Sequence, residues 1–369
     1  MEKKIIHQIK KLKKNNKFLL SYKRLNVLIT GTTGFKGAWL AYWLNNLGAN
    51  ITGVSLKPEK NSILFKSLKL EKKIKQYYLD IGNYNNINNV IKKVKPDIIF
   101  HLAAQSIVSK SFINPLQTLN TNIIGSANIL ESFRINKIPN LVYITSDKCY
   151  LNLDKTFSFK EQDVLGGLDN YSSSKASAEI IFSSYFHSFF KKDNFLRLAS
   201  ARAGNVIGGG DMKSNRIIPD IVKSYNSNKN IILRSPKSTR PWQHVLEPLS
   251  GYLLIGHKLI NKKLKRKLLP CWNFGPELRN CKNVEIITKL FLKRLKVKKI
   301  KIRTENRKKF HESKFLSLNI NKAKKELNWR PRLTLDKTIN FTADWYKKYF
   351  DREDMEKFTT QQIQLFLDN

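Results

Sequence analysis

The chain has 369 residues, of which 41% are apolar and 11% aromatic. This composition excludes an intrinsically disordered chain and a disulfide-stapled miniprotein, and the length predicts two domains or one large α/β domain with a smaller lobe. The 68 Lys and Arg against 28 Asp and Glu residues give a net charge of +40, densest in residues 1–24 and 258–309. Because no RNA-binding or helix-turn-helix pattern accompanies these charges, we expect a solvated basic surface and no nucleic-acid partner.

Residues 1–24 lack the apolar core of a secretory signal, and no stretch reaches the roughly 18 uninterrupted apolar residues of a membrane span. The cysteines Cys149, Cys271 and Cys281 are odd in number and lack zinc-site spacing, so neither disulfides nor a metal site are predicted. His101 is interpreted as structural because the histidines are scattered along the chain. We expect a cytoplasmic protein without membrane association.

Strand and helix patterns alternate in the first half of the chain. Residues 25–30 form a short apolar run that ends at glycines, which is typical of a buried parallel strand. Residues 35–47 then follow a helical period, and Gly48 stands where a left-handed residue ends a helix. Further strands are predicted at 51–56, 74–79, 97–102, 141–145 and 196–201, and helices near 86–94, 115–135 and 171–191. This alternation predicts an α/β fold with a Rossmann-type doubly wound parallel sheet.

From about residue 205 the alternation breaks into loops rich in Gly, Pro and Arg, with shorter helices between them. We therefore divide the chain into a basic N-terminal extension (1–24), a dinucleotide-binding Rossmann domain (25–204) and a smaller C-terminal lobe (205–369). The lobe is expected to be mainly substrate-binding, with interleaved segments.

A glycine-rich turn lies between the first predicted strand and helix, with Gly31, Gly34 and Gly37 in a GxxGxxG spacing. Such glycines let the backbone approach a pyrophosphate, whose charge the helix N-terminus then holds. The strand-turn-helix context predicts a dinucleotide site. The other residues of the turn that we assign to the cofactor are Thr33, Phe35 and Lys36.

Two later strand ends are also assigned to the cofactor. Asp80 and Ile81 follow the third predicted strand, where they can contact the adenine, although a helix-capping Asp80 fits the same position. Ala103, Ala104 and Gln105 follow the fourth strand, and the small alanines would let a flat cofactor lie against the backbone.

The second predicted strand lacks the acidic residue that commonly binds the adenosine ribose. This region reads Ser55-Leu56-Lys57-Pro58. Because Lys57 can meet a 2′-phosphate, the sequence leaves NAD and NADP both open.

Tyr171 and Lys175 have a YxxxK spacing, which places the phenol and the ammonium about one helical turn apart on one face. A nearby cation favours the tyrosinate, so this pattern predicts a lowered tyrosine pKa and a general base for a sugar hydroxyl. The alternative is an exposed pair without a catalytic role.

Ser146, Asp147 and Lys148 stand at the carboxyl end of the fifth predicted strand, the edge where open α/β sheets bind ligands. Together they offer a hydrogen-bond donor, a general acid and a charged partner. The ammonium of Lys148 opposes protonation of Asp147, so an acid at Asp147 requires burial or substrate to offset that charge. The alternatives are a Lys148 that is neutral when needed, or a polar loop that only caps the strand.

With these motifs, the chain resembles the extended short-chain dehydrogenases/reductases, and within them the CDP-glucose 4,6-dehydratase family. The wider resemblance rests on segments 30–37, 101–105, 122–125 and 171–175. The narrower one rests on Ser-Asp-Lys at 146–148, where the dTDP-glucose type has Thr-Asp-Glu, and on segments 202–211, 216–221, 240–254, 272–276 and 322–331. It covers about residues 25–350.

The resemblance implies an internal redox cycle with NAD as cofactor and CDP-glucose or a related nucleotide sugar as substrate. Tyr171, assisted by Lys175 and Ser146, would deprotonate the sugar 4-hydroxyl during hydride transfer. Asp147 would protonate the leaving 6-hydroxyl, and Lys148 occupies the position implicated in C5 deprotonation. The product would be CDP-4-keto-6-deoxyglucose.

The resemblance also implies a substrate site and a homodimer. The residues placed around the nucleotide diphosphate are Asn205, Arg216, Arg234, Arg240 and His244; a packed, non-binding His244 fits equally. The helices near 115–135 and 171–191 would form the dimer interface. Two departures stand out. Relatives commonly carry an Arg soon after the AAQ segment, whereas residues 106–111 here contain none, and Lys110 is the candidate substitute, with poorer geometry. Residues 1–24 extend beyond the usual start.

Two other functions remain open on sequence. A nucleotide-sugar 4-epimerase needs Tyr171 and Lys175 but has no use for an acid and a base at 147 and 148. A basic scaffold protein with a vestigial fold would bind polyanions and turn over no nucleotide sugar.

Overall fold

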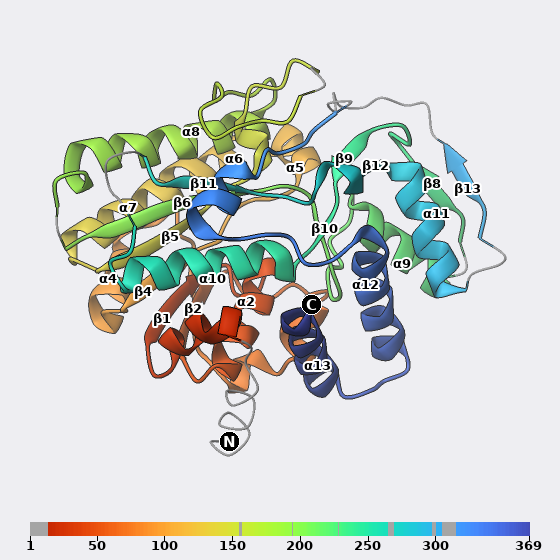
Figure 1. Cartoon of the computed structure of the whole chain (residues 1–369), viewed down its shortest axis with the longest axis horizontal. Coiled ribbons are helices and arrows are strands. Elements are labelled where there is room, and N and C mark those ends of the chain that lie inside the picture. The colour runs from red at the N-terminus through yellow and green to blue at the C-terminus, as the bar shows by residue number, and fades with distance from the viewer. Residues whose placement is uncertain are drawn as a thin grey trace.

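A parallel sheet forms the centre of the molecule (Figure 1). The computed structural model describes residues 14–154, 157–193, 195–227, 229–264, 269–296, 300–304 and 315–369. The strands run in the order β11-β6-β5-β4-β1-β2-β3, and every neighbouring pair is parallel. They are β1 (Asn26–Thr30), β2 (Asn50–Ser55), β3 (Lys75–Tyr78), β4 (Ile98–His101), β5 (Asn140–Ile144), β6 (Arg197–Ala203) and β11 (Cys271–Phe274).

Alternation along β1 shows how the sheet is covered on both faces. Val27 and Ile29 belong to one apolar cluster, and Leu28 between them belongs to another. Successive side chains of a strand point to opposite faces, so each face has its own core. The first face packs against α2 (Phe35–Asn46) and α10 (Leu246–Ile260), and the second against α4 (Tyr84–Val94), α7 (Gly125–Ile135) and α8 (Asn170–Tyr185). The doubly wound α/β fold predicted from the sequence is confirmed.

The predicted strands lie within two residues of the observed ones, and Gly48 has the expected left-handed conformation, with φ +84°. The helix predicted near 115–135 differs, because the π-helical turn η3 (Asn120–Ile124) interrupts it after α6 (Pro115–Leu119). At this turn the buried Asn122 accepts a hydrogen bond from Gln105 N and donates to Ser174 Oγ. The irregular turn thus ties the end of β4 to α8.

The second half of the chain forms the lobe on the right of Figure 1 and then returns to the sheet. Its helices are α9 (Ile217–Ser227), α11 (Val284–Leu295) and α12 (Leu335–Phe350), and its paired strands are β7 (Val206–Ile207) with β10 (Gln243–His244), β8 (Ile231–Leu233) with β13 (Ile302–Thr304), and β9 (Thr239–Pro241) with β12 (Cys281–Asn283). Strand β11 extends the sheet beside β6, and α10 covers it. The last helix, α13 (Met355–Asp368), packs on α2, where Tyr42 Oη donates to the carbonyl oxygen of Glu356 at 2.7 Å.

The end of the N-terminal extension is part of the folded body, which corrects the expectation of a merely solvated segment. In the 3-10 helix η1 (Lys14–Tyr22), Leu19 and Tyr22 are fully buried. Tyr22 Oη donates to Leu253 O at 2.6 Å, and Asn16 Nδ2 donates to Leu367 O at 2.9 Å. These contacts join η1 to α10 and α13. Residues 1–13, and positions 265–268, 297–299 and 305–314 of the basic stretch, lie outside the described residues.

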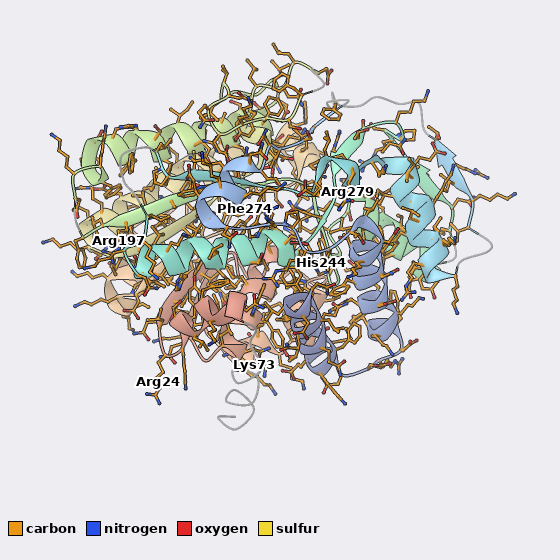
Figure 2. All side chains as sticks on the ribbon, viewed as in Figure 1. Arg24, Lys73, Arg197, His244, Phe274 and Arg279 are labelled. Carbon is orange, nitrogen blue, oxygen red and sulfur yellow. The ribbon has the colours of Figure 1, made fainter. Side chains whose placement is uncertain are left out.

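The basic charge is distributed over separate surfaces. Figure 2 shows Arg24 at the N-terminal side of the molecule and Arg279 at the opposite side of the view, and both are exposed. Each helix in the described part of the chain is too short or too polar to span a bilayer.

Glu247 in the first turn of α10 gives the fold a testable pH dependence. Its Oε1 accepts hydrogen bonds from Arg332 N at 2.9 Å and Leu333 N at 2.7 Å, and burial raises its pKa to about 7 from 4.5. The folded state therefore binds more protons than the unfolded state between these pKa values, and the free energy of unfolding falls as the pH rises through this window, by about 3 kcal/mol.

We expect Glu247→Gln to remove this contribution, because the amide does not titrate. Urea unfolding of both proteins at pH 5 and pH 8 measures the effect. Between pH 5 and pH 8, the free energy of unfolding of the parent should fall by about 3 kcal/mol more than that of the variant. Equal losses would contradict the assignment.

Candidate active site

A cleft of about 570 Å³ opens at the carboxyl ends of the parallel strands, between the sheet and the lobe. Both parts of the chain line it: the sheet side contributes the glycine-rich turn, the ends of β2 to β5 and the start of α8, and the lobe side contributes residues 204–220 and 232–242. The chain order reverses between β1 and β4, and open α/β sheets bind ligands at such a switch point.

The glycine-rich turn forms a cradle at one end of this cleft. Gly31 has φ +82°, and a Cβ there would lie 3.0 Å from the Ala103 backbone. A Cβ on Gly37 would lie 2.0 Å from Gly31 O, so the third glycine lets α2 pack against the turn. Gly34 has no side chain to cap α2, and the first-turn N–H groups lie at the cleft, where they suit a pyrophosphate. The remaining predicted cofactor residues also line the cleft: Thr33, Phe35, Lys36, Asp80, Ile81, Ala103, Ala104 and Gln105.

Tyr171 and Lys175 lie at the start of α8, which begins here because Asp169 caps it. The Asp169 carboxylate accepts hydrogen bonds from Tyr171 N and Ser172 N, both at 2.9 Å. Both predicted catalytic side chains are buried and line the cleft, with Lys175 Nζ 5.9 Å from the centre of the Tyr171 ring. The helical spacing therefore brings the phenol and the ammonium together as predicted.

The predicted lowering of the Tyr171 pKa is wrong for the protein alone. Burial and then the Asp147 charge raise the Tyr171 pKa to about 12, against smaller lowering effects of Arg216 and of a hydrogen bond with Ser146. Burial and the Lys36 charge lower the Lys175 pKa to about 8. The spacing correctly predicted that the two groups lie close together. Their desolvation, however, has a larger effect on the two pKa values than the nearby cation, and it favours the neutral form of both groups.

The loop that follows β5 carries Ser146, Asp147 and Lys148, and all three line the cleft. Ser146 Oγ donates to Asp147 Oδ1 at 2.9 Å and accepts from Lys148 N at 3.2 Å. Burial raises the Asp147 pKa. This effect is larger than the opposing effects of the hydrogen bond from Ser146 and of the positive charges on Lys148, Arg240 and Lys36. The offset that the sequence required for an acid at this position is therefore supplied by burial.

Asp147 Oδ2 differs from Oδ1 in having no hydrogen-bond partner among the described residues, although it is buried. Asp147 as a whole residue is 3% exposed, and it lines the cleft. A buried carboxyl oxygen without a protein partner suits a hydroxyl of a bound ligand.

A buried ion pair beneath the cleft was not predicted. Glu179 lies one helical turn after Lys175 on α8, and its Oε2 is 2.8 Å from Arg202 of β6; both side chains are at most 2% exposed. Glu179 Oε1 also accepts hydrogen bonds from Thr145 and Ser200. A carboxylate at i+4 from Lys175 on a buried helix face, and an arginine within a buried strand, are the sequence signals that point to such a pair.

The same arginine reaches the other end of the loop that carries residues 146–148. Arg202 donates to Tyr150 Oη at 2.9 Å, and Tyr150 Oη donates to Asn273 Oδ1 of β11 at 2.8 Å. Thr145 and Tyr150 flank residues 146–148, so Glu179 and Arg202 hold both ends of the segment that carries Asp147, the predicted acid.

The predicted substrate residues divide into two groups. Arg216 has one guanidinium nitrogen 2.7 Å from Asp211 Oδ2 and another that donates to Ser106 Oγ at 2.8 Å, so it is oriented at the cleft wall. Lys110, the candidate substitute for the missing arginine, lines the cleft as well. The predicted substrate residues that line the cleft are Asn205, Arg216, Arg234 and Arg240.

The prediction that His244 contacts the substrate is wrong. His244 is fully buried, and its ring packs edge-on against Trp39 and Phe341, 5.9 and 5.5 Å away. Figure 2 shows it in the interior near the start of α10, and burial lowers its pKa to about 3. His101 is structural as predicted, since it hydrogen-bonds Thr30 Oγ1 and Ser126 Oγ at 2.8 and 3.0 Å.

The fold and the convergence of a glycine cradle with a Tyr-Lys pair define the chain as an extended short-chain dehydrogenase/reductase. The sequence profile of the GDP-mannose 4,6-dehydratase family matches residues 28–342, and the chain belongs to this family. It is 40% identical over 335 residues to the CDP-glucose 4,6-dehydratase of Salmonella typhimurium, covering 89% of this chain and 92% of the relative.

Solved structures show the same fold at lower identity. The dTDP-glucose 4,6-dehydratase of Bacillus anthracis in complex with NAD is 24% identical, with a TM-score of 0.73 over 90% of this chain and 99% of its own. The UDP-glucose 4-epimerase of Thermotoga maritima with UDP-glucose is 20% identical, with a TM-score of 0.75 over 88% of this chain and 100% of its own.

We expect Glu179→Gln to lower the free energy of unfolding by about 3 kcal/mol, because removing one charge of a buried pair leaves the other uncompensated. Glu131→Gln is the matched control. Glu131 and Arg134 are also an ion pair, at 2.6 Å, but their side chains are 29% and 33% exposed. Glu131→Gln should lower the free energy of unfolding by less than about 1 kcal/mol. Equal losses in urea unfolding of the two variants would contradict a structural role for the buried pair.

Proposed function

We propose that this enzyme is a CDP-glucose 4,6-dehydratase, which converts CDP-D-glucose into CDP-4-keto-6-deoxy-D-glucose and water. The observation that carries the proposal is the buried Asp147 carboxyl, followed directly by Lys148, in the same cleft as Tyr171 and Lys175. Removal of water from a sugar needs an acid for the leaving hydroxyl and a base for the carbon-bound proton, in addition to the groups that oxidise C4. The similarity to the Salmonella typhimurium enzyme supports the same substrate.

NAD is the proposed cofactor, and when bound it accepts a hydride from the sugar C4 and returns it to C6. The glycine cradle and the start of α2 would hold its pyrophosphate, and the ends of β3 and β4 would contact its adenosine and nicotinamide parts. The protein groups around that hydride path do the proton chemistry.

Tyr171 is the proposed base for the sugar 4-hydroxyl. In the protein alone, its pKa of about 12 keeps the proton on Oη. The tyrosinate must therefore be favoured by the charges that the bound ligands bring into the site. Ser146 hydrogen-bonds both Tyr171 and Asp147. It therefore links the group that takes a proton to the group that gives one, and Lys175 supplies the positive charge beside the phenol.

Asp147 and Lys148 would carry the elimination. Because burial keeps the Asp147 carboxyl protonated to higher pH, Oδ2 can donate its proton to the leaving 6-hydroxyl. Lys148 lines the cleft one residue away, where a neutral amine would take the C5 proton. The 4-ketone makes that proton acidic, so the order of oxidation before elimination follows from the chemistry.

The nucleotide diphosphate would lie against the lobe. Arginine holds phosphate oxygens in two-point contact, and Arg216, Arg234 and Arg240 line that wall together with Asn205. Lys110 offers a point charge in place of a planar fork, so we expect it to bind phosphate with less directional selectivity.

We propose a domain boundary at residue 204, which separates this wall from the cofactor cradle. Residues 25–204 would then mainly bind the cofactor, and residues 205–369 would mainly bind the substrate.

We further propose that the reaction takes place in the cytoplasm, since Cys149, Cys271 and Cys281 are all unpaired, as in a reducing compartment.

We also propose a homodimer formed through α6, α7 and α8. Leu116 is 80% exposed on α6 and Ile180 is 54% exposed on α8, which are costly positions for large apolar side chains in water. The paired substitutions Leu116→Asp and Ile180→Asp should shift the protein from dimer to monomer in sedimentation velocity. A parent protein that sediments as a monomer would contradict the proposal.

The function is tested by incubating the protein and NAD with CDP-, dTDP-, GDP- and UDP-glucose and measuring the absorbance of a 4-keto sugar in alkali. We expect ketone from CDP-glucose at a rate at least tenfold above the others, since a site built to hydrogen-bond one base leaves polar groups unpaired with another. A 4-epimer without ketone would support an epimerase. Salt-dependent RNA binding without turnover of any sugar would support a scaffold protein.

Two variants separate the half-reactions in the same assay. Tyr171→Phe should lower turnover by at least about 100-fold and show no cofactor reduction, because the base is lost. Asp147→Asn should still reduce the cofactor, seen by the absorbance of the reduced nicotinamide, but stall before water loss. Product release by the Asn variant at the parent rate would exclude Asp147 as the acid.

A further inference from the structure

The end of β2 differs from the usual arrangement of a NAD-selective site. In dinucleotide-binding folds a carboxylate at this strand end binds the 2′-hydroxyl of the adenosine ribose, whereas a cation nearby accommodates the 2′-phosphate of NADP. Here β2 ends at Ser55, and Leu56 and Lys57 follow. All three residues line the cleft on the side of the glycine cradle.

Ser55 occupies the position of the missing carboxylate, but its hydroxyl is already engaged. It accepts a hydrogen bond from Gln76 Nε2 at 3.0 Å and lies 3.3 Å from Thr32 Oγ1, and the residue is 4% exposed. Thr32 Oγ1 also donates to Gln76 Oε1 at 2.7 Å. The cluster closes the strand end with neutral groups, so Ser55 neither holds a 2′-hydroxyl as a carboxylate would nor repels a 2′-phosphate.

The two residues after Ser55 face solvent at the cleft rim. Leu56 is 59% exposed, and its carbonyl oxygen accepts a hydrogen bond from Thr33 Oγ1 at 3.1 Å. This bond ties the loop to the glycine-rich turn, so the Leu56-Lys57 segment stays beside the cofactor cradle. Lys57 is exposed and lines the cleft, which puts an ammonium next to the predicted ribose position.

Two carboxylates line this half of the cleft, and neither occupies the β2 end. Asp80 follows β3, and its Oδ1 accepts a hydrogen bond from Gly82 N at 2.8 Å, within its own turn. Glu59 lies two residues beyond Lys57, and its negative charge raises the pKa of Lys213 in the lobe across the cleft, against the larger lowering effect of burial. The feature that usually excludes NADP is thus absent from the described end of β2.

We propose that the cofactor site binds NADP as well as NAD, with Lys57 as the residue that meets the 2′-phosphate. The inference rests on the proposed function only in requiring a dinucleotide in this cleft. An exposed ammonium and a phosphate attract each other modestly, and no carboxylate at the strand end opposes them. The two dinucleotides should therefore bind with dissociation constants within about tenfold of each other.

Isothermal titration calorimetry of the full chain, freed of co-purified nucleotide, with NAD and with NADP tests this inference without relying on turnover. Lys57→Glu should weaken NADP binding on the order of tenfold and change NAD binding less than threefold. Leu56→Asp, which restores a carboxylate beside the strand end, should likewise weaken NADP and spare NAD. Lys60→Glu is the matched control, because Lys60 is exposed in the same loop but does not line the cleft, and it should leave the ratio of the two constants unchanged.

Each outcome bears on a different claim. A parent protein that binds NAD more than about tenfold more tightly than NADP overturns the inference and leaves the proposed function intact. Equal loss of NADP binding in Lys57→Glu and Lys60→Glu overturns the assignment to Lys57, because it would show only a general charge effect. Failure of both dinucleotides to bind contradicts the proposed function itself.

Discussion

The buried ion pair between Glu179 and Arg202 fixes the geometry on which the proposed chemistry depends. Tyr171 and Lys175 come from α8, whereas Ser146, Asp147 and Lys148 come from the loop after β5, so their relative placement requires that helix and sheet cannot slide. Glu179 on α8 binds Arg202 on β6 and accepts a hydrogen bond from Thr145, at the start of that loop. Two charges that cannot be hydrated at this depth must stay together, and this requirement keeps the two elements in register.

Desolvation then sets the protonation states in the cleft above. It raises the pKa of Asp147 and Tyr171 and lowers the pKa of Lys175, which moves all three groups towards their neutral forms. For Asp147 this is the form that an acid needs. For Tyr171 it is the opposite of the form that a base needs, so the phenol depends on its surroundings in the filled site. In the proposed mechanism, the same burial therefore prepares the elimination step in the protein alone and leaves the oxidation step to be completed by ligand binding.

The sequence predicted most of the sheet because its signals are local. Short runs of five or six residues and the glycine-rich turn marked the strands. The carboxyl ends of parallel strands meet at one edge, which brought the motifs after β1, β3, β4 and β5 into one cleft. What the sequence did not predict depends on distant partners. The Glu179–Arg202 pair joins positions 23 residues apart on separate elements. The family resemblance placed His244 at the substrate, yet Trp39 and Phe341, which are distant in the chain, enclose its ring.

The return of the chain to the sheet explains why the two halves depend on each other. Strand β11 pairs with β6, aligning Asn273 with Arg202, and Asn273 accepts the hydrogen bond from Tyr150 that ends the polar network under the loop of residues 146–148. Asn273 N in turn donates to Glu161 Oε1 at 2.8 Å, in the segment between that loop and α8. A piece of the chain ending at residue 204 would lack Asn273 and leave Tyr150 and the Glu161 carboxylate without these partners. The predicted catalytic residues of the first half are therefore held by a strand that the second half supplies, and this dependence favours one cooperative unit over a cofactor domain that folds first and a lobe that is added to it.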